Sequence, residues 1–228
     1  MDPTASIALA AGAAWASGLN AYAVILILGV LGNTGYMTLP ADLELLMHPM
    51  VMIAAGFMYC VEFFADKTPG VDTGWDAIHT FVRVPAGALL AAGAMGDMQP
   101  ALQASAVLLG GGLAATSHTT KAATRVMLNT SPEPFSNWTA SIAEDIAVLG
   151  GIWAALNHPV IFLIVLAIIV LIMWWVIPKL WRGVKHVFRA IVRFFGGKAE
   201  DEKPDKLTAN NTPPPSLDNV DPKALGEP

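Results

Sequence analysis

Residues 160–177 read VIFLIVLAIIVLIMWWVI, an uninterrupted apolar stretch without a charged side chain. Such a run favours a transmembrane helix, because about 20 helical residues cross a hydrocarbon core of about 30 Å. The whole chain agrees with this interpretation. Of its 228 residues, 54% are hydrophobic and 14% are charged, whereas a soluble domain carries about 25% charged residues. The sequence therefore predicts an all-α, polytopic membrane protein.

Further apolar segments extend the prediction to a bundle of about six transmembrane helices. Ser17-Gly18-Leu19-Asn20 interrupts the first segment, so Gly18 and Asn20 are candidate helix breaks. His48-Pro49 opens the second, where proline suits the first helical turn. The predicted helices before residue 160 are 7–31, 48–65, 76–95, 101–128 and 138–156.

The end of the chain differs from the apolar body. Basic residues recur at steps of three and four from Lys179 to Arg193, interleaved with apolar ones, which predicts a basic amphipathic helix over 179–196 that contacts anionic lipid. The tail over 197–228 is rich in Pro, Asp and Asn and is expected to be disordered. The predicted transmembrane domain is therefore 1–178.

Lysine and arginine indicate how the bundle is oriented. With six helices and both termini in the cytoplasm, Lys67, Arg83, Lys121, Arg125 and all later bases lie on the cytoplasmic side, as the positive-inside rule requires. An alternative with five spans, in which 138–156 lies on the membrane surface, places four bases on the opposite side. We therefore expect six spans.

Two stretches separated by 63 residues resemble each other. Thr68-Pro69 matches Ser131-Pro132, Trp75 matches Trp138, and Gly87 matches Gly150. Duplication of a helix hairpin would produce this pattern, as in many transporter folds. Coincidence among common loop residues is the alternative.

Ionisable side chains form one stripe on each of four helices, all in the predicted cytoplasmic half. A charge near the bilayer centre costs about 2.5–3.5 kcal/mol, so these residues are expected to face one another around a polar cavity open to the cytoplasm. A salt-bridge network that fixes helix register is the structural alternative. The candidate binding or transport residues are Glu62, Asp66, Lys67, Asp72, Asp76, His79, Arg83, His118, Lys121, Arg125, Asn129, Ser141, Glu144 and Asp145.

Several strings from 9 to 170 resemble a bacterial membrane family catalogued as a domain of unknown function (DUF 4126). The resemblance implies a multi-pass protein of the bacterial inner membrane and supplies no activity. The strings that carry it are GLNAY (18–22), EFFADKTPGVD (62–72), Trp75-Asp76, RVPAG (83–87), HTTKA (118–122), NTSPEP (129–134), Glu144-Asp145 and His158-Pro159.

Three functions remain open from the residues. The first is a small transporter or channel that binds an ion or an anionic substrate. The second is a membrane enzyme for lipid-linked or phosphorylated substrates, in which Asp66, Asp72 and Asp76 would bind a divalent metal. The third is a non-catalytic assembly factor. The first is preferred, with no catalytic residue, resident metal, cofactor or nucleic-acid partner expected, and the small size suggests a homodimer.

Overall fold

A computed structural model describes residues 2–96, 98–130 and 134–194, and the elements in these ranges are helical. The chain divides into a unit from Met1 to Ala190, which holds the helical bundle, and a unit from Ile191 to Pro228, of which only the last residues of α6 are described. The elements are α1 (Pro3–Asn33), the 3-10 helix η1 (Ala41–Met47), α2 (Pro49–Ala65), α3 (Val71–Met95), α4 (Pro100–Leu128), α5 (Pro134–Asn157) and α6 (Pro159–Phe194).

Local sequence explains most of the helix starts. Five of these α-helices, all except α3, begin at a proline, whose fixed φ suits the first turn and whose missing N–H leaves no donor unpaired there. α3 follows Gly70, which has a φ of +86°. Asp72 closes this turn, because its Oδ1 accepts from the backbone N–H groups of Gly70 and Thr73 at 2.9 and 2.6 Å.

The prediction of an all-α membrane bundle is confirmed. In the described ranges, α1, α3, α5 and α6 are long and apolar enough to cross a membrane, and η1 with α2, bent by 68°, makes a fifth candidate. α4 falls outside this set because its second half carries His118, Lys121 and Arg125 among hydroxyl side chains. Length and hydropathy therefore give four or five candidate spans where six were expected.

α1 is broken at the predicted position. Asn20 has φ −153° and ψ 96°, which are extended values between two helical stretches. Its Oδ1 accepts from the backbone N–H of Ala23 at 2.9 Å, as an N-cap residue does at a helix start. α1 is thus two half-helices, residues 3–19 and 21–33, and Asn20 caps the second.

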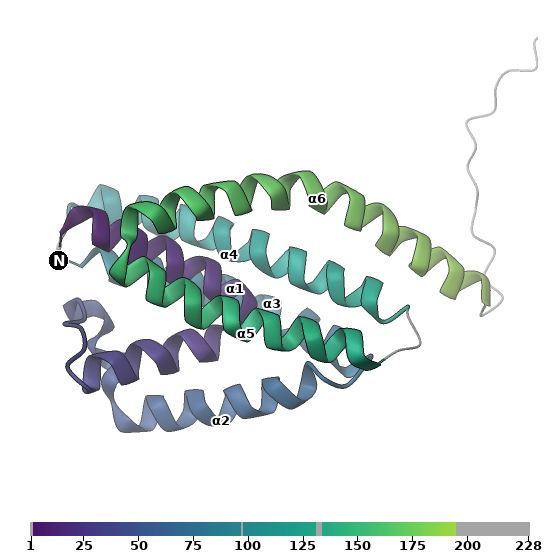
Figure 1. Ribbon diagram of the computed structural model, residues 1–228, viewed down its shortest axis with the longest axis horizontal. Helices are drawn as coiled ribbons and strands as arrows, with labels where there is room; N and C mark the ends of the chain where they lie inside the picture. The colour runs from purple at the N-terminus through teal and green to yellow at the C-terminus, as the bar shows by residue number, and fades with distance from the viewer. Residues whose placement is uncertain (1, 97, 131–133, 195–228) are drawn as a thin grey trace, which may run out of the picture. The chain divides into compact units, whose positions relative to one another are not determined.

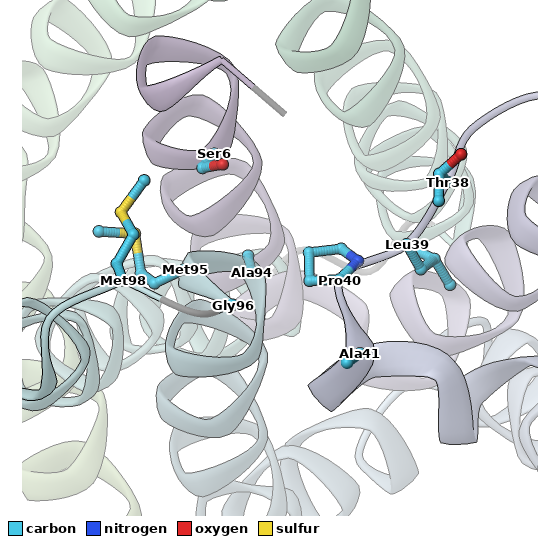
Figure 2. A pocket seen from close by; sticks show the side chains of 9 residues that line it. All are labelled: Ser6, Thr38, Leu39, Pro40, Ala41, Ala94, Met95, Gly96 and Met98. Carbon is cyan, nitrogen blue, oxygen red and sulfur yellow. The ribbon is translucent and has the colours of Figure 1, made fainter.

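The two half-helices run in opposite directions, so that both ends of α1 lie beside the segment 34–48. Near its start, Ser6 lines a cleft of about 340 Å³ together with Pro40 and Gly96 (Figure 2). At its end, Asn33 Nδ2 donates to the carbonyl of Met47 at 2.8 Å. Figure 1 shows α1 leaving the N-terminus and turning back toward the same end of the bundle. We call α1 the re-entrant hairpin and residues 17–22 its tip.

The contacts of the loops define two ends of the bundle. The N-terminal end holds the cleft with Ser6, Pro40 and Gly96, and Tyr36 donates there to Asn157 Oδ1 at 3.3 Å. The basic end holds residues 66–70, the loop between α2 and α3 that contains Lys67. Asn129 Nδ2 donates there to Asp72 Oδ1 at 2.8 Å, and Gly183 of α6 lies against Met127 of α4. α2, α3, α4 and α5 each run between these two ends.

The side of the membrane on which each terminus lies stays a prediction, but the described parts of α1 and α6 reach different ends of the bundle. The start of α1 lies at the N-terminal end, whereas Gly183 of α6 lies against Met127 at the basic end. The reason is the reversal at Asn20: a hairpin returns to its starting side, where a straight helix of this length would cross.

The basic segment is helical, and the domain boundary predicted before Lys179 stays a prediction. α6 continues through Pro178 to Phe194 as one helix of 36 residues, so residues 179–194 extend the last predicted span and no break separates them. The tail over 197–228, for which disorder was predicted, lies outside the described residues. The matched residues Trp75 and Trp138 fall near the starts of α3 and α5, and duplication of the hairpin stays a prediction.

Small residues bring the first half-helix, α3 and α4 into close contact. Gly87 of α3 lies against Ala114 of α4, and Gly110 of α4 lies against Ala91 of α3. Such contacts allow backbones to approach closely inside a membrane. Farther along α3 and α4, toward the basic end, the side chains of the two helices are therefore close enough for direct contact.

Candidate functional site

Seven charged side chains from four helices meet near the basic end of the bundle. Their helical spacing, such as four residues between Glu62 and Asp66, places each pair on one face. Seven ion pairs with N–O distances of 2.7 to 3.6 Å connect them. The group, which we call the charge network, consists of Glu62 and Asp66 of α2, Asp76 and Arg83 of α3, Lys121 and Arg125 of α4, and Glu144 of α5.

Arg83 joins two carboxylates and a histidine. Its Nη2 donates to Glu62 Oε1 and its Nη1 to Asp76 Oδ1, both at 2.7 Å. Nη1 also lies 2.9 Å from His118 Nδ1. A guanidinium only donates hydrogen bonds, so His118 Nδ1 accepts and carries no proton. His118 Nε2 is then the protonated nitrogen and donates to Thr80 Oγ1 at 2.7 Å, which makes this histidine neutral.

Lys121 and Arg125 hold the other two carboxylates. Lys121 Nζ lies 2.7 Å from Asp66 Oδ2, 3.2 Å from Glu144 Oε2 and 3.6 Å from Glu62 Oε1. Arg125 Nη2 lies 2.7 Å from the same Glu144 oxygen. Arg125 Nη1 donates to the carbonyl of Asp66, at the C-terminal end of α2, at 2.7 Å. These contacts tie α4 to both α2 and α5.

The tip of the re-entrant hairpin contacts the charge network directly. A half-helix that ends inside a protein leaves carbonyl groups without helical partners. Lys121 Nζ donates to the carbonyl of Leu19 at 3.0 Å, and Ser117 Oγ donates to that of Trp15 at 2.8 Å. Ser17 Oγ in turn donates to the carbonyl of Arg83 at 3.0 Å. The broken backbone of α1 is therefore held by the residues that carry the charges.

The charge network is closed to solvent, in contrast to the predicted open polar cavity. The side chains of Arg83, Arg125 and Glu62 are 0% exposed, and Glu144, the most exposed member, reaches 18%. The predicted stripes do face one another, but they meet in direct ion pairs. The close approach of α3 and α4 leaves the carboxylates and cations within hydrogen-bonding distance.

Asp72, Asn129 and Asn137 form a separate polar cluster at the basic end. Asn129 Nδ2 donates to Asp72 Oδ1 at 2.8 Å, and Asn129 Oδ1 accepts from Asn137 Nδ2 at 2.6 Å. These bonds connect the starts of α3 and α5 to the end of α4. The cluster therefore joins the described ends of these three helices next to the charge network.

Lys67, Ser141 and Asp145 lie at the side of the charge network. Lys67 Nζ donates to Ser141 Oγ at 3.3 Å and stands over the ring of Phe63. Burial lowers the pKa of Lys67, and the Asp145 carboxylate opposes this shift. Asp145 also lines a cleft of about 130 Å³ with Tyr59. Ser141 and Asp145 belong to α5 and Lys67 contacts it, and none of these three predicted residues joins the seven ion pairs.

His79 contacts the hairpin. Its ring stacks on Trp75 with centroids 4.2 Å apart, and its Nε2 lies 3.2 Å from the hydroxyl of Tyr22. Sequence reasoning did not select Tyr22, Ser17, Thr80 or Ser117 as candidates. A hydroxyl in an apolar helix is a signal for them, because such groups bond across helices in a membrane.

The aspartates proposed as metal ligands have separate partners. Asp66 binds Lys121, Asp76 binds Arg83, and Asp72 binds the turn at Gly70 and Asn129. Within the described ranges, no three acidic, histidine or cysteine side chains are grouped so that they could hold a metal ion. The geometry therefore gives the metal-dependent enzyme no specific support.

Comparison with protein families shows to which family the chain belongs. The sequence model of the family described as "Domain of unknown function (DUF4126)" matches residues 7–179. The chain belongs to the DUF4126 family. The match spans α1 to the middle of α6 and so includes the re-entrant hairpin and the charge network of this DUF4126 member. Comparison with curated proteins and with solved structures gave no match.

Proposed function

We propose that this DUF4126 member is a small membrane transporter whose translocation site is formed by the hairpin tip and the charge network. The observation that carries the proposal is the helix break at Asn20, inside a bundle of apolar helices, where the carbonyl of the preceding Leu19 accepts from Lys121. Broken helices at membrane depth are tolerated where protein or a cavity surrounds them, and transporters place their substrate sites there. Ionisable residues within a bundle are costly and are commonly part of transport pathways.

The closed charge network fits an occluded state of such a transporter. Hydrogen bonds that hold the hairpin tip include the one from Lys121 to the carbonyl of Leu19 and the one from Ser17 to the carbonyl of Arg83. Withdrawal of the tip would free Lys121 and expose the carboxylates that it contacts. The same contacts would serve a purely structural network, so a functional measurement separates the two.

Reconstitution into liposomes tests the proposal. Gradients of H⁺, Na⁺, K⁺, chloride and inorganic phosphate are imposed in turn, and ion-sensitive dyes and charge movement are recorded. We expect flux above that of empty liposomes for at least one ion. Glu144→Gln removes a carboxylate that touches both Lys121 and Arg125, and we expect it to reduce this flux at least tenfold.

Glu44→Gln is the matched control, because Glu44 is exposed on η1 at the opposite end. It should transport at the wild-type rate. Both variants are first checked for expression and monodispersity. Absence of flux under every gradient, or normal flux in Glu144→Gln, would count against the transporter and favour the structural network or an assembly role.

The orientation follows from the basic end. Lys67, Lys121, Arg125 and the bases of α6 up to Arg189 lie on the side of the bundle that the positive-inside rule assigns to the cytoplasm. We therefore propose the bacterial inner membrane as the location, with the basic end in the cytoplasm and the start of α1 outside. α6 is about 54 Å long at 1.5 Å per residue, so its basic turns can reach beyond the bilayer to anionic headgroups.

Cysteine labelling checks this orientation. In a Cys60→Ala background, single cysteines replace the exposed residues Asp2, Thr34 and Thr68. A membrane-impermeant maleimide added to intact cells should label the first two positions, and Thr68→Cys should react only after the membrane is opened. If Asp2→Cys behaves like Thr68→Cys, α1 crosses the membrane and the hairpin is wrong.

A further inference from the structure

The charge network holds more acids than bases. Its carboxylates are Glu62, Asp66, Asp76 and Glu144, and its cations are Arg83, Lys121 and Arg125. With every group ionised, the network carries one negative charge without a partner. An unmatched charge in an apolar interior is costly, and such a group commonly neutralises by binding a proton.

The N–O distances of the ion pairs show which carboxylates carry the unmatched negative charge. Asp66 and Glu144 share two cations, Lys121 and Arg125, each with a contact of 2.7 Å. Glu62 and Asp76 share one, because Arg83 lies 2.7 Å from both and Lys121 is 3.6 Å from Glu62. The unmatched negative charge therefore belongs to the pair Glu62 and Asp76.

Among the residues that the structure describes, the surroundings of this pair supply no further cation. His118 of α4 is neutral because it accepts from Arg83, and His79 of α3 faces the hydroxyl of Tyr22. Asp66 adds a negative charge on the same helix as Glu62. The titratable and charged groups that face the pair are thus Tyr22 of α1, Asp66 of α2, His79 and Arg83 of α3, and His118 and Lys121 of α4, with Glu144 of α5 beyond Lys121.

We infer that Glu62 and Asp76 share one bound proton, which serves as the coupling ion of the proposed transporter. Each of these carboxyl groups has one oxygen engaged by Arg83 and one oxygen, Glu62 Oε2 or Asp76 Oδ2, that is buried without a hydrogen-bond partner. A proton on either free oxygen converts one carboxylate to a carboxylic acid and brings the network to zero net charge.

Proton loss would be transmitted to the hairpin through Lys121. Its ammonium is 3.6 Å from Glu62 and 3.0 Å from the carbonyl of Leu19. A second full negative charge beside Arg83 attracts this ammonium toward Glu62 and away from the hairpin tip. This step rests on the proposed transport function, whereas the bound proton itself does not.

Infrared spectroscopy of the full-length protein in lipid nanodiscs tests the inference. At neutral pH we expect the carbonyl stretch of a buried carboxylic acid, which shifts on exchange into D₂O. Glu62→Gln and Asp76→Asn should each abolish it, because the remaining carboxylate then has Arg83 to itself. Asp42→Asn, at an exposed position on η1, should keep the band at wild-type intensity.

The outcomes separate this inference from the transport proposal. Absence of the acid band from the wild-type protein at every pH at which it stays folded would overturn the shared proton, and so would its persistence in both variants. Ion flux without the band would leave a transporter with a different coupling ion. The band without any flux would leave a protonated pair in a protein that does not transport.

Discussion

Arg83→Met is expected to destabilise the bundle by about 3–5 kcal/mol, because removal of one partner leaves buried charges unpaired. Glu62 and Asp76 both depend on this guanidinium, and all three side chains are at most 1% exposed. Methionine fills part of the volume and supplies no positive charge. Denaturant titration in mild detergent, followed by tryptophan fluorescence, measures the loss.

Neutralising the two carboxyl groups that bind Arg83 should reverse the loss of stability. Combining Arg83→Met with Glu62→Gln and Asp76→Asn removes both carboxyl groups that depend on Arg83, so the triple variant should recover most of the lost stability. Arg182→Met is the matched control, because Arg182 is exposed and its Nε donates to the carbonyl of Pro178 in its own helix. An Arg83→Met protein as stable as this control would show that the ion pairs carry no net stability.

The charge network was the part of the site most accessible from sequence. Charges are too costly to face lipid, and helical spacing places Lys121 and Arg125 on one face of α4, so an inward-facing cluster follows from local information. The distance between the helices decides whether such side chains form direct ion pairs closed to solvent or line a cavity. Here the contacts of Gly87 with Ala114 and of Gly110 with Ala91 set that distance, and they join residues distant in sequence.

The course of α1 could be predicted only in part. The interruption at Ser17–Asn20 was visible, but the segment is long and apolar enough to span a membrane. Its reversal depends on contacts with α4, about a hundred residues away, such as Ser117 with the carbonyl of Trp15. The consequence for topology is large, because a hairpin in place of a span puts the start of α1 and the end of α1 at the same end of the bundle.

Gly18→Ala is expected to displace the hairpin tip. An added Cβ at this position would overlap Ser117 Oγ and the backbone carbonyl oxygen of Ala114. Ser117 is engaged with the carbonyl of Trp15, and the carbonyl of Ala114 cannot move without α4. Relief therefore requires the tip to move away from α4, which breaks the bond from Lys121 to Leu19.

Overpacking of this kind costs about 1–3 kcal/mol, and the proposed transport should fall at least tenfold because the tip forms part of the site. Gly112→Ala is the matched control, since Gly112 is a helical glycine of α4 with open space around its Cβ position; alanine there should preserve both stability and flux. The two variants are compared by denaturant titration and by the liposome assay. Equal stability of the two proteins would mean that the tip does not pack against α4 through Gly18. A Gly18→Ala protein that is less stable but transports normally would instead separate the hairpin from the translocation site, because the packing would then be real and the tip would have no part in ion movement.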